Sequence, residues 1–198
     1  HQDKGGRGGG RKYLTFLMGG SVGLVLPAMI VLFTLAGDLT FADSIHTGII
    51  PEGTAAPVVF CLFFAFLFGF AKNGVMPLHA WLPDTYPEAT VPGAVFMCAF
   101  TTKTAVYVLA RAFAGFEILA VAGTIMAVYG VLYASMENNA RRILSYHIVS
   151  QVGYMVLGLG LFTPLALAGA VFYLLHHIVV KTNLFLISGL LRRYGGAF

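Results

Sequence analysis

The sequence predicts an all-α, polytopic membrane protein with about six transmembrane helices, one of them discontinuous. Of its 198 residues, 58% are hydrophobic and only 10% are charged, whereas an ordinary soluble domain carries about 25% charged residues. The apolar residues also form runs of about 20 residues, the length that a helix needs to cross a bilayer. The composition therefore excludes a disordered chain and argues against a water-soluble globule.

The N-terminal part changes abruptly in charge. Residues 1–12 combine glycines with five charged side chains, which predicts a flexible, basic cytoplasmic loop. The next 24 residues, 13–36, contain no charged side chain. At about 1.5 Å per residue they can cross a hydrocarbon core of about 30 Å. They form the first span of a transmembrane domain predicted to cover 13–198.

The second predicted span, 55–86, is interrupted. Polar and helix-breaking residues follow its apolar first half: Lys72, Asn73, Gly74 and Pro77. Proline lacks the N–H group that a helix interior requires, and broken transmembrane helices occur where backbone lines a polar cavity. We therefore expect a helix break near 73–77.

Four further spans are predicted, at 91–114, 116–136, 143–162 and 164–191. Charged or turn-forming residues separate them. Lys103 lies about twelve residues into its span and Lys181 about seventeen residues into the last one. Both lysines are therefore expected within the hydrocarbon core.

The distribution of basic residues predicts the topology. With the N-terminal end inside, eight basic residues fall on the inner side: Lys4, Arg7, Arg11, Lys12, Arg141, Arg142, Arg192 and Arg193. Only Arg111 falls outside, as the positive-inside rule requires. Taken together, the twelve lysines and arginines do not gather on one surface, so no nucleic-acid partner is expected. We expect an integral protein of the bacterial inner (plasma) membrane.

The lysines within the spans are the main candidates for function. A charged lysine at the bilayer centre costs about 2.5–3.5 kcal/mol even on the mildest insertion scale. The three in question are Lys72, Lys103 and Lys181. A lysine that faces a movable acid can take up and release a proton near neutral pH. The alternative is snorkelling, in which each side chain reaches the interface.

Span 143–162 carries a polar stripe on one helical face. Its members recur at i, i+3, i+4 and i+7: His147, Ser150, Gln151 and Tyr154. Two interpretations apply: the stripe holds water that relays protons, or its members join neighbouring helices by hydrogen bonds. Tyr107, one turn after Lys103, either extends such a relay or bonds the lysine.

The last span contains two histidines next to a lysine. His177 and Lys181 are i and i+4 neighbours on one face, and His176 lies on the adjacent face. Because histidine titrates near neutrality, this cluster can bridge two lysines. Consecutive helical residues point about 100° apart and do not chelate one ion. No metal, haem or other cofactor and no catalytic residue is therefore predicted.

Four sequence blocks resemble the antiporter-like membrane subunits shared by respiratory complex I (L, M and N types) and Mrp Na⁺/H⁺ antiporters. The blocks are AKNGVMPLHAWLPD at 71–84, TKTAVY at 102–107, RRILSY with SQVGY at 141–154, and HHIVVK at 176–181. The resemblance covers the chain from about Tyr13 to its end. The lysine at 103 and the HHIVVK form look most like the Mrp D type.

The resemblance implies a fold and a set of site residues. It implies the middle part of a bundle of about fourteen helices built from inverted repeats, each with a broken helix. By position, Lys72 matches the lysine of the first broken helix and Lys103 the residue that passes the proton toward the centre. His177 and Lys181 match the central His-x-x-x-Lys. The acidic partner of Lys72 and the second broken helix would lie outside this internal fragment.

The function expected from this resemblance is proton translocation through buried lysine and histidine side chains. The parent protein is either a subunit of an Mrp-type Na⁺/H⁺ antiporter or a subunit of a complex I-like NADH:quinone oxidoreductase, without redox centres of its own. The expected partners are other membrane subunits, the lipid bilayer, H⁺ and Na⁺ as a second candidate ion. The alternative is a non-conducting structural subunit that docks its partners.

Overall fold

The described elements of the protein are all helical. A computed structural model describes residues 4–37, 50–51, 53–70 and 74–194. The elements in chain order are α1 (Lys4–Gly20), η1 (Ser21–Val25), α2 (Leu26–Ala36), α3 (Ala56–Gly69), η3 (Leu78–Ala80), α4 (Trp81–Thr85), α5 (Val91–Phe96), η4 (Met97–Thr101), α6 (Thr102–Ala112), α7 (Glu117–Met136), α8 (Ala140–Leu161) and α9 (Pro164–Tyr194).

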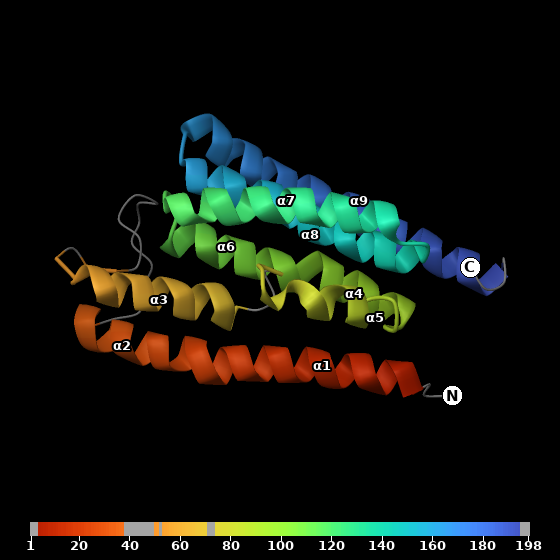
Figure 1. Ribbon diagram of the computed structural model, residues 1–198, viewed down its shortest axis with the longest axis horizontal. Coiled ribbons are helices and arrows are strands. Elements are labelled where there is room, and N and C mark those ends of the chain that lie inside the picture. Colours follow the sequence, from red (N-terminus) through yellow and green to blue (C-terminus); the bar gives the residue numbers. More distant parts are fainter. Residues whose placement is uncertain (1–3, 38–49, 52, 71–73, 195–198) are drawn as a thin grey trace.

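These elements form six crossings whose helix axes are roughly aligned, while the chain direction alternates from one crossing to the next (Figure 1). The α1–η1–α2 helix lies at one side next to α3, the α4–α6 segment lies in the middle, and α7, α8 and α9 lie at the other side. Among the described residues, five helices are long and apolar enough to span a membrane: 8–36, 91–112, 117–136, 140–161 and 164–191. The remaining crossing is the interrupted one, so the expectation of an all-α membrane protein with one discontinuous helix is confirmed.

The interrupted crossing consists of α3 and, further along the chain, η3 and α4. The apolar helix α3 ends at Gly69, and the chain resumes helical structure at η3 and α4. Gly74 has a φ of +65°, a left-handed conformation that favours glycine, and a Cβ there would lie 2.5 Å from Leu82 Cδ1. Gly74 and Pro77 therefore lie in the non-helical connection, as expected, whereas Lys72 and Asn73 lie outside the described residues.

Two spans contain a π-helical turn that the hydrophobic pattern does not predict. One is η1, between α1 and α2, and the other is η4, between α5 and α6. The pattern gives the extent of a span but not the register of its backbone hydrogen bonds, which a π-turn changes.

Helices α7 and α8 pack through small residues. A Cβ added at Gly130 would lie 2.5 Å from the Ser150 backbone nitrogen, and one at Gly153 would lie 2.6 Å from that of Ala127. Ser150 Oγ donates a hydrogen bond of 2.9 Å to the Ala127 carbonyl across this contact. Close backbone approach with an interhelical hydrogen bond is typical of helix association in lipid.

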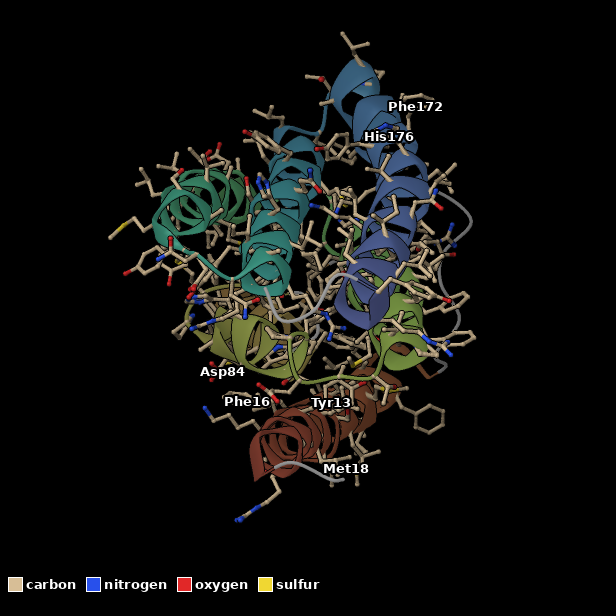
Figure 2. All side chains as sticks on the ribbon, turned by 90° about the vertical axis from the view of Figure 1, so that its right-hand side faces the viewer. Tyr13, Phe16, Met18, Asp84, Phe172 and His176 are labelled. Atoms are coloured by element: carbon tan, nitrogen blue, oxygen red, sulfur yellow. The ribbon has the colours of Figure 1, made fainter. Side chains whose placement is uncertain are left out.

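The N-terminal segment differs from the expected flexible loop, because it is helical from Lys4 onward. Its glycines allow this helix to approach α4: Thr85 Oγ1 donates a hydrogen bond of 3.3 Å to the Gly9 carbonyl. Lys12 Nζ lies 2.6 Å from Asp84 Oδ2. Figure 2 shows this end of the molecule, where Tyr13 lies next to the α4 region. Packing against a neighbouring helix thus outweighs the low helix propensity of glycine.

The two chain ends lie at the same end of the bundle, as six crossings require (Figure 1). The basic residues at the starts of α1 and α8 and at the end of α9 belong to this end, whereas Arg111, in the last turn of α6, belongs to the opposite one. The arrangement agrees with the predicted topology and with an integral membrane protein.

Candidate functional site

Two lysines lie inside the helical bundle. Lys103, in the first turn of α6, is 4% exposed, and Lys181, in the middle of α9, is 2% exposed. Snorkelling brings an ammonium group to the membrane interface, whereas these side chains are covered by neighbouring helices. Protein burial of both lysines therefore favours a site over snorkelling.

The π-turn η4 determines the surroundings of Lys103. Residues five apart point about 140° apart in an α-helix, but the i→i+5 register of a π-turn brings such residues together. Cys98 and Lys103 are five apart, and Lys103 Nζ lies 4.0 Å from Cys98 Sγ. The ammonium group also donates a hydrogen bond of 3.0 Å to Thr102 Oγ1.

Helix α9 completes the cluster. His177 is 2% exposed, and neither of its ring nitrogens has a hydrogen-bond partner among the described residues. It interacts electrostatically with both Lys103 and Lys181. The Cys98 thiol also interacts with both lysines. The structure thus brings together three of the predicted residues, Lys103, His177 and Lys181, with Cys98 as an additional member. We refer to these four residues as the lysine cluster.

The predicted stripe on α8 divides between two neighbours. Ser150 is buried against α7 through its hydrogen bond to Ala127, which is the interhelical role. His147 interacts electrostatically with Lys181 and so lies on the side of the lysine cluster. Gln151 is partly buried, with no hydrogen-bond partner for Oε1 among the described residues. Tyr154 is half exposed and contacts the Tyr173 ring at a centroid distance of 6.3 Å.

Two further predicted residues lie away from the cluster. Tyr107 is 55% exposed, although it follows Lys103 by one turn. His176 is exposed, and its ring centroid lies 6.0 Å from that of Tyr173. In Figure 2, His176 and Phe172 lie on α9 at the side of the molecule opposite Tyr13. Their relay roles stay predictions, as does the role of Lys72.

The sequence did not predict that Arg141 is buried and hydrogen-bonded. The positive-inside rule places this side chain on the cytoplasmic side, yet the residue is only 7% exposed. Its Nη1 donates hydrogen bonds to the carbonyls of Pro87, at 2.8 Å, and Ala89, at 3.1 Å. Arg141 therefore fixes the turn after α4 to the start of α8. The basic-residue count gave its side of the membrane but not its burial.

Cys98 and Tyr86 were also missed. The cysteine has no role predicted from the sequence, and only the π-turn brings it to Lys103. Tyr86 follows α4 and is fully buried, and its ring centroid lies 5.5 Å from that of Phe185 on α9. Within the described ranges, no three His, Cys, Asp or Glu side chains gather as a metal site needs.

Comparison with known proteins gives the family. The sequence matches the family described as "NADH:quinone oxidoreductase/Mrp antiporter, TM" over residues 7–196. The chain belongs to this family. The NADH:quinone oxidoreductase/Mrp antiporter family thus accounts for the four sequence blocks and confirms the resemblance based on them.

Relatives of several types share this membership. The chain is 38% identical to the D-type subunit of the Na(+)/H(+) antiporter of Alkalihalophilus pseudofirmus, covering 93% of this chain and 39% of the relative. It is 35% identical to the N-type subunit of the NADH-quinone oxidoreductase of Desulforudis audaxviator, covering 80% and 34%. It is 32% identical to hydrogenase-4 component B of Escherichia coli, covering 95% and 30%.

A solved structure supports the same assignment. A chain in the structure of the Mrp complex from Dietzia sp. DQ12-45-1b matches with a TM-score of 0.83 and 32% identity, covering 96% of this chain and 36% of that one. The sequence therefore spans less than two fifths of the length of these members of the NADH:quinone oxidoreductase/Mrp antiporter family. It is an antiporter-like membrane segment.

Proposed function

We propose that this segment carries part of a proton path in an antiporter-like subunit of an Mrp-type Na⁺/H⁺ antiporter or a complex I-like NADH:quinone oxidoreductase. The observation that supports it is the convergence of Lys103, His177 and Lys181 in the protein interior. Three basic groups of this kind are expensive in a membrane, and such groups mark proton relays. Other membrane subunits are the proposed partners, and a bacterial inner membrane is the proposed location.

The proton moves between the basic groups by way of water. Neither ring nitrogen of His177 is hydrogen-bonded to a described residue, so bridging waters complete the path. His177 accepts and releases protons between the two lysines, because its ring nitrogens are not committed to hydrogen bonds with described residues. Repulsion between the lysine charges drives the proton onward. Lys72 is the proposed switch at the start of the path.

Protons fit this site better than Na⁺. Hard cations prefer several oxygen ligands, above all carboxylates. The cluster instead offers amines, an imidazole, a thiol and the Thr102 hydroxyl. Two ammonium groups repel a metal cation. Na⁺ binding in the parent complex is therefore assigned to other residues.

The proposal is tested by substitution of single lysines in the full-length subunit, assembled in its complex. Lys103→Ala, Lys181→Ala and Lys72→Ala should each abolish proton transport into inverted vesicles. Lys12→Ala is the matched control, since this lysine is exposed, pairs with Asp84 and lies outside the cluster. Wild-type flux per assembled complex in the three buried variants, with reduced assembly, would instead indicate a structural subunit.

A second measurement distinguishes the two parent complexes. Inverted vesicles that contain the wild-type complex are energised either with NADH or with an imposed Na⁺ gradient. Acidification of the lumen by NADH identifies a complex I-like parent. Proton movement that occurs only with the Na⁺ gradient identifies an Mrp-type antiporter.

A further inference from the structure

The two buried lysines need a counter-charge. An ammonium group taken out of water is stable only when it is paired or hydrogen-bonded. The acidic residues in the described ranges lie at helix ends or in turns: Asp84, Glu88, Glu117 and Glu137. Asp84 and Glu137 are already paired there, with Lys12 and Arg142. Within the described part of the chain, the counter-charge has to come from another type of group.

Cys98 is the acidic side chain inside the cluster. Its Sγ lies 4.0 Å from Lys103 Nζ, and the thiol also interacts electrostatically with Lys181. Cys98 is fully buried, and the π-turn η4 directs it toward Lys103. Burial opposes a charge on the thiol, and the two nearby lysines act in the other direction by favouring the thiolate form. Serine or alanine at this position would provide no comparable anion.

Two other buried groups point to proton exchange around the thiol. Tyr86 is fully buried, interacts electrostatically with Cys98, and has no hydrogen-bond partner for its hydroxyl among the described residues. His177 approaches the same lysines with both ring nitrogens unpartnered among those residues. Buried polar groups are normally hydrogen-bonded to protein or to ordered water. The cluster therefore has open capacity for water or for a shared proton.

Building on the proposed function, we propose that the Cys98 thiolate is the common counter-charge of Lys103 and Lys181 and exchanges a proton with them. The Sγ–H bond breaks and an Nζ–H bond forms, which converts a thiol and a neutral amine into a thiolate and an ammonium group. The electron pair of the broken bond stays on sulfur, so no oxidation occurs. When the proton moves from one lysine to the other, the thiolate remains between them.

The pH dependence of this exchange involves the titratable groups among the described residues that interact with the cluster. These groups come from five helical segments around η4: Tyr13 on α1, Tyr86 after α4, Lys103 on α6, His147 on α8, and His176, His177 and Lys181 on α9. Removing the thiol leaves these other groups in place. A change in the pH profile after substitution of Cys98 therefore reports on the thiol within this set.

The test uses the full-length subunit in its complex, with proton flux measured across a range of pH in inverted vesicles. Cys98→Ser keeps the size of the side chain but not its acidity, and should lower flux per assembled complex about tenfold and alter the pH profile. Cys98→Asp restores an anion and should return flux to within about twofold of wild type. Cys61→Ser is the control, because this thiol is exposed on α3; it should have no effect.

The outcomes separate this inference from the proposed function. If Cys98→Ser keeps the wild-type rate and pH profile while the lysine variants abolish flux, the thiolate role is overturned and the proton path stands. Equal loss of flux in the serine and aspartate variants also overturns it, because acidity then has no influence. If the lysine variants retain wild-type flux, both proposals fail.

Discussion

The helix α8 and the N-terminal crossing at 8–36 differ in how far the rest of this chain buries them. Of the most apolar part of each helix, 67% is buried within this chain in α8 and only 22% in the N-terminal crossing, although the N-terminal crossing is the more hydrophobic of the two. The more polar helix is thus the more buried one. In a soluble protein the trend is the reverse, because apolar residues leave water there.

The difference shows where polar groups are tolerated in this bundle. A helix that faces lipid has no partner for polar side chains, so it must be apolar. A helix surrounded by protein can carry serine, histidine and arginine when neighbouring helices supply partners. Ser150 and Arg141 illustrate this on α8, with partners on α7 and in the turn after α4.

The largest expected effect comes from filling the contact between α7 and α8. Gly130→Leu should lower the free energy of unfolding by about 3 kcal/mol, because the new side chain meets the backbone of Ser150. Gly19→Leu, in the N-terminal crossing, should be nearly neutral, since nothing lies within 4 Å of a Cβ there. Unfolding in a denaturing detergent measures both variants. Equal stability of the two would contradict the contrast between the regions.

Removal of the Arg141 guanidinium should have the next largest effect. Arg141→Ala leaves the Pro87 and Ala89 carbonyls without this donor, which we expect to destabilise the protein by about 2–3 kcal/mol. Arg142→Ala should cost less than about 1 kcal/mol, because the Arg142–Glu137 pair at 3.5 Å is partly exposed. Thermal unfolding of the two purified variants checks the order, and a larger effect for Arg142→Ala would refute it.

The hydrogen bond between α8 and α7 should contribute modestly. Ser150→Ala removes the bond to the Ala127 carbonyl and should lower the free energy of unfolding by about 0.6 kcal/mol. Ser135→Ala is the matched control, because Ser135 bonds the Val131 carbonyl of its own helix on an exposed face. Denaturant unfolding of both should show a loss only for Ser150→Ala. A similar loss for both would show that the interhelical hydrogen bond of Ser150 contributes no more to stability than the intrahelical one of Ser135.

The smallest effect is expected at the Lys12–Asp84 ion pair. Both side chains are substantially exposed, so Lys12→Ala should destabilise the protein by about 0.2–0.5 kcal/mol at low salt. Added salt screens exposed charges, and the difference from wild type should therefore shrink at high ionic strength. Unfolding at two salt concentrations checks this. A salt-independent loss would show that the lysine stem contributes by packing.

Hydrophobic patterning was sufficient to predict an all-α membrane protein with one discontinuous helix. Gly74 and Pro77, which suggested the break, lie in the connection between α3 and η3. The extent of the N-terminal helix was wrong, because the contact between Gly9 and Thr85 joins residues 76 positions apart. No local pattern contains such a contact.

Of the residues that the structure brings together, Lys103, His177 and Lys181 could be named as candidates from the sequence, whereas Cys98 could not. Lys103 and Lys181 stand out because a charge within an apolar run is costly. Cys98 looks like any small hydrophobic residue in the sequence, and its approach to Lys103 depends on the backbone register of η4. The division of the α8 stripe depends on which helix faces each side chain, which periodicity alone does not give.

The π-turn η4 acts as a phase shift within a single span. A π-turn has one residue more than the α-helical turn it replaces, so the α5 and α6 faces are offset by about 100°. Deleting one residue from 97–101 would keep the length of the crossing almost unchanged but rotate α6 relative to α5. With α5 held by its contact between Val91 and Gly189 of α9, Lys103 would turn away from α9. The orientation of Lys103 toward α9 thus depends on the one extra residue of the π-turn, and not on side-chain chemistry alone.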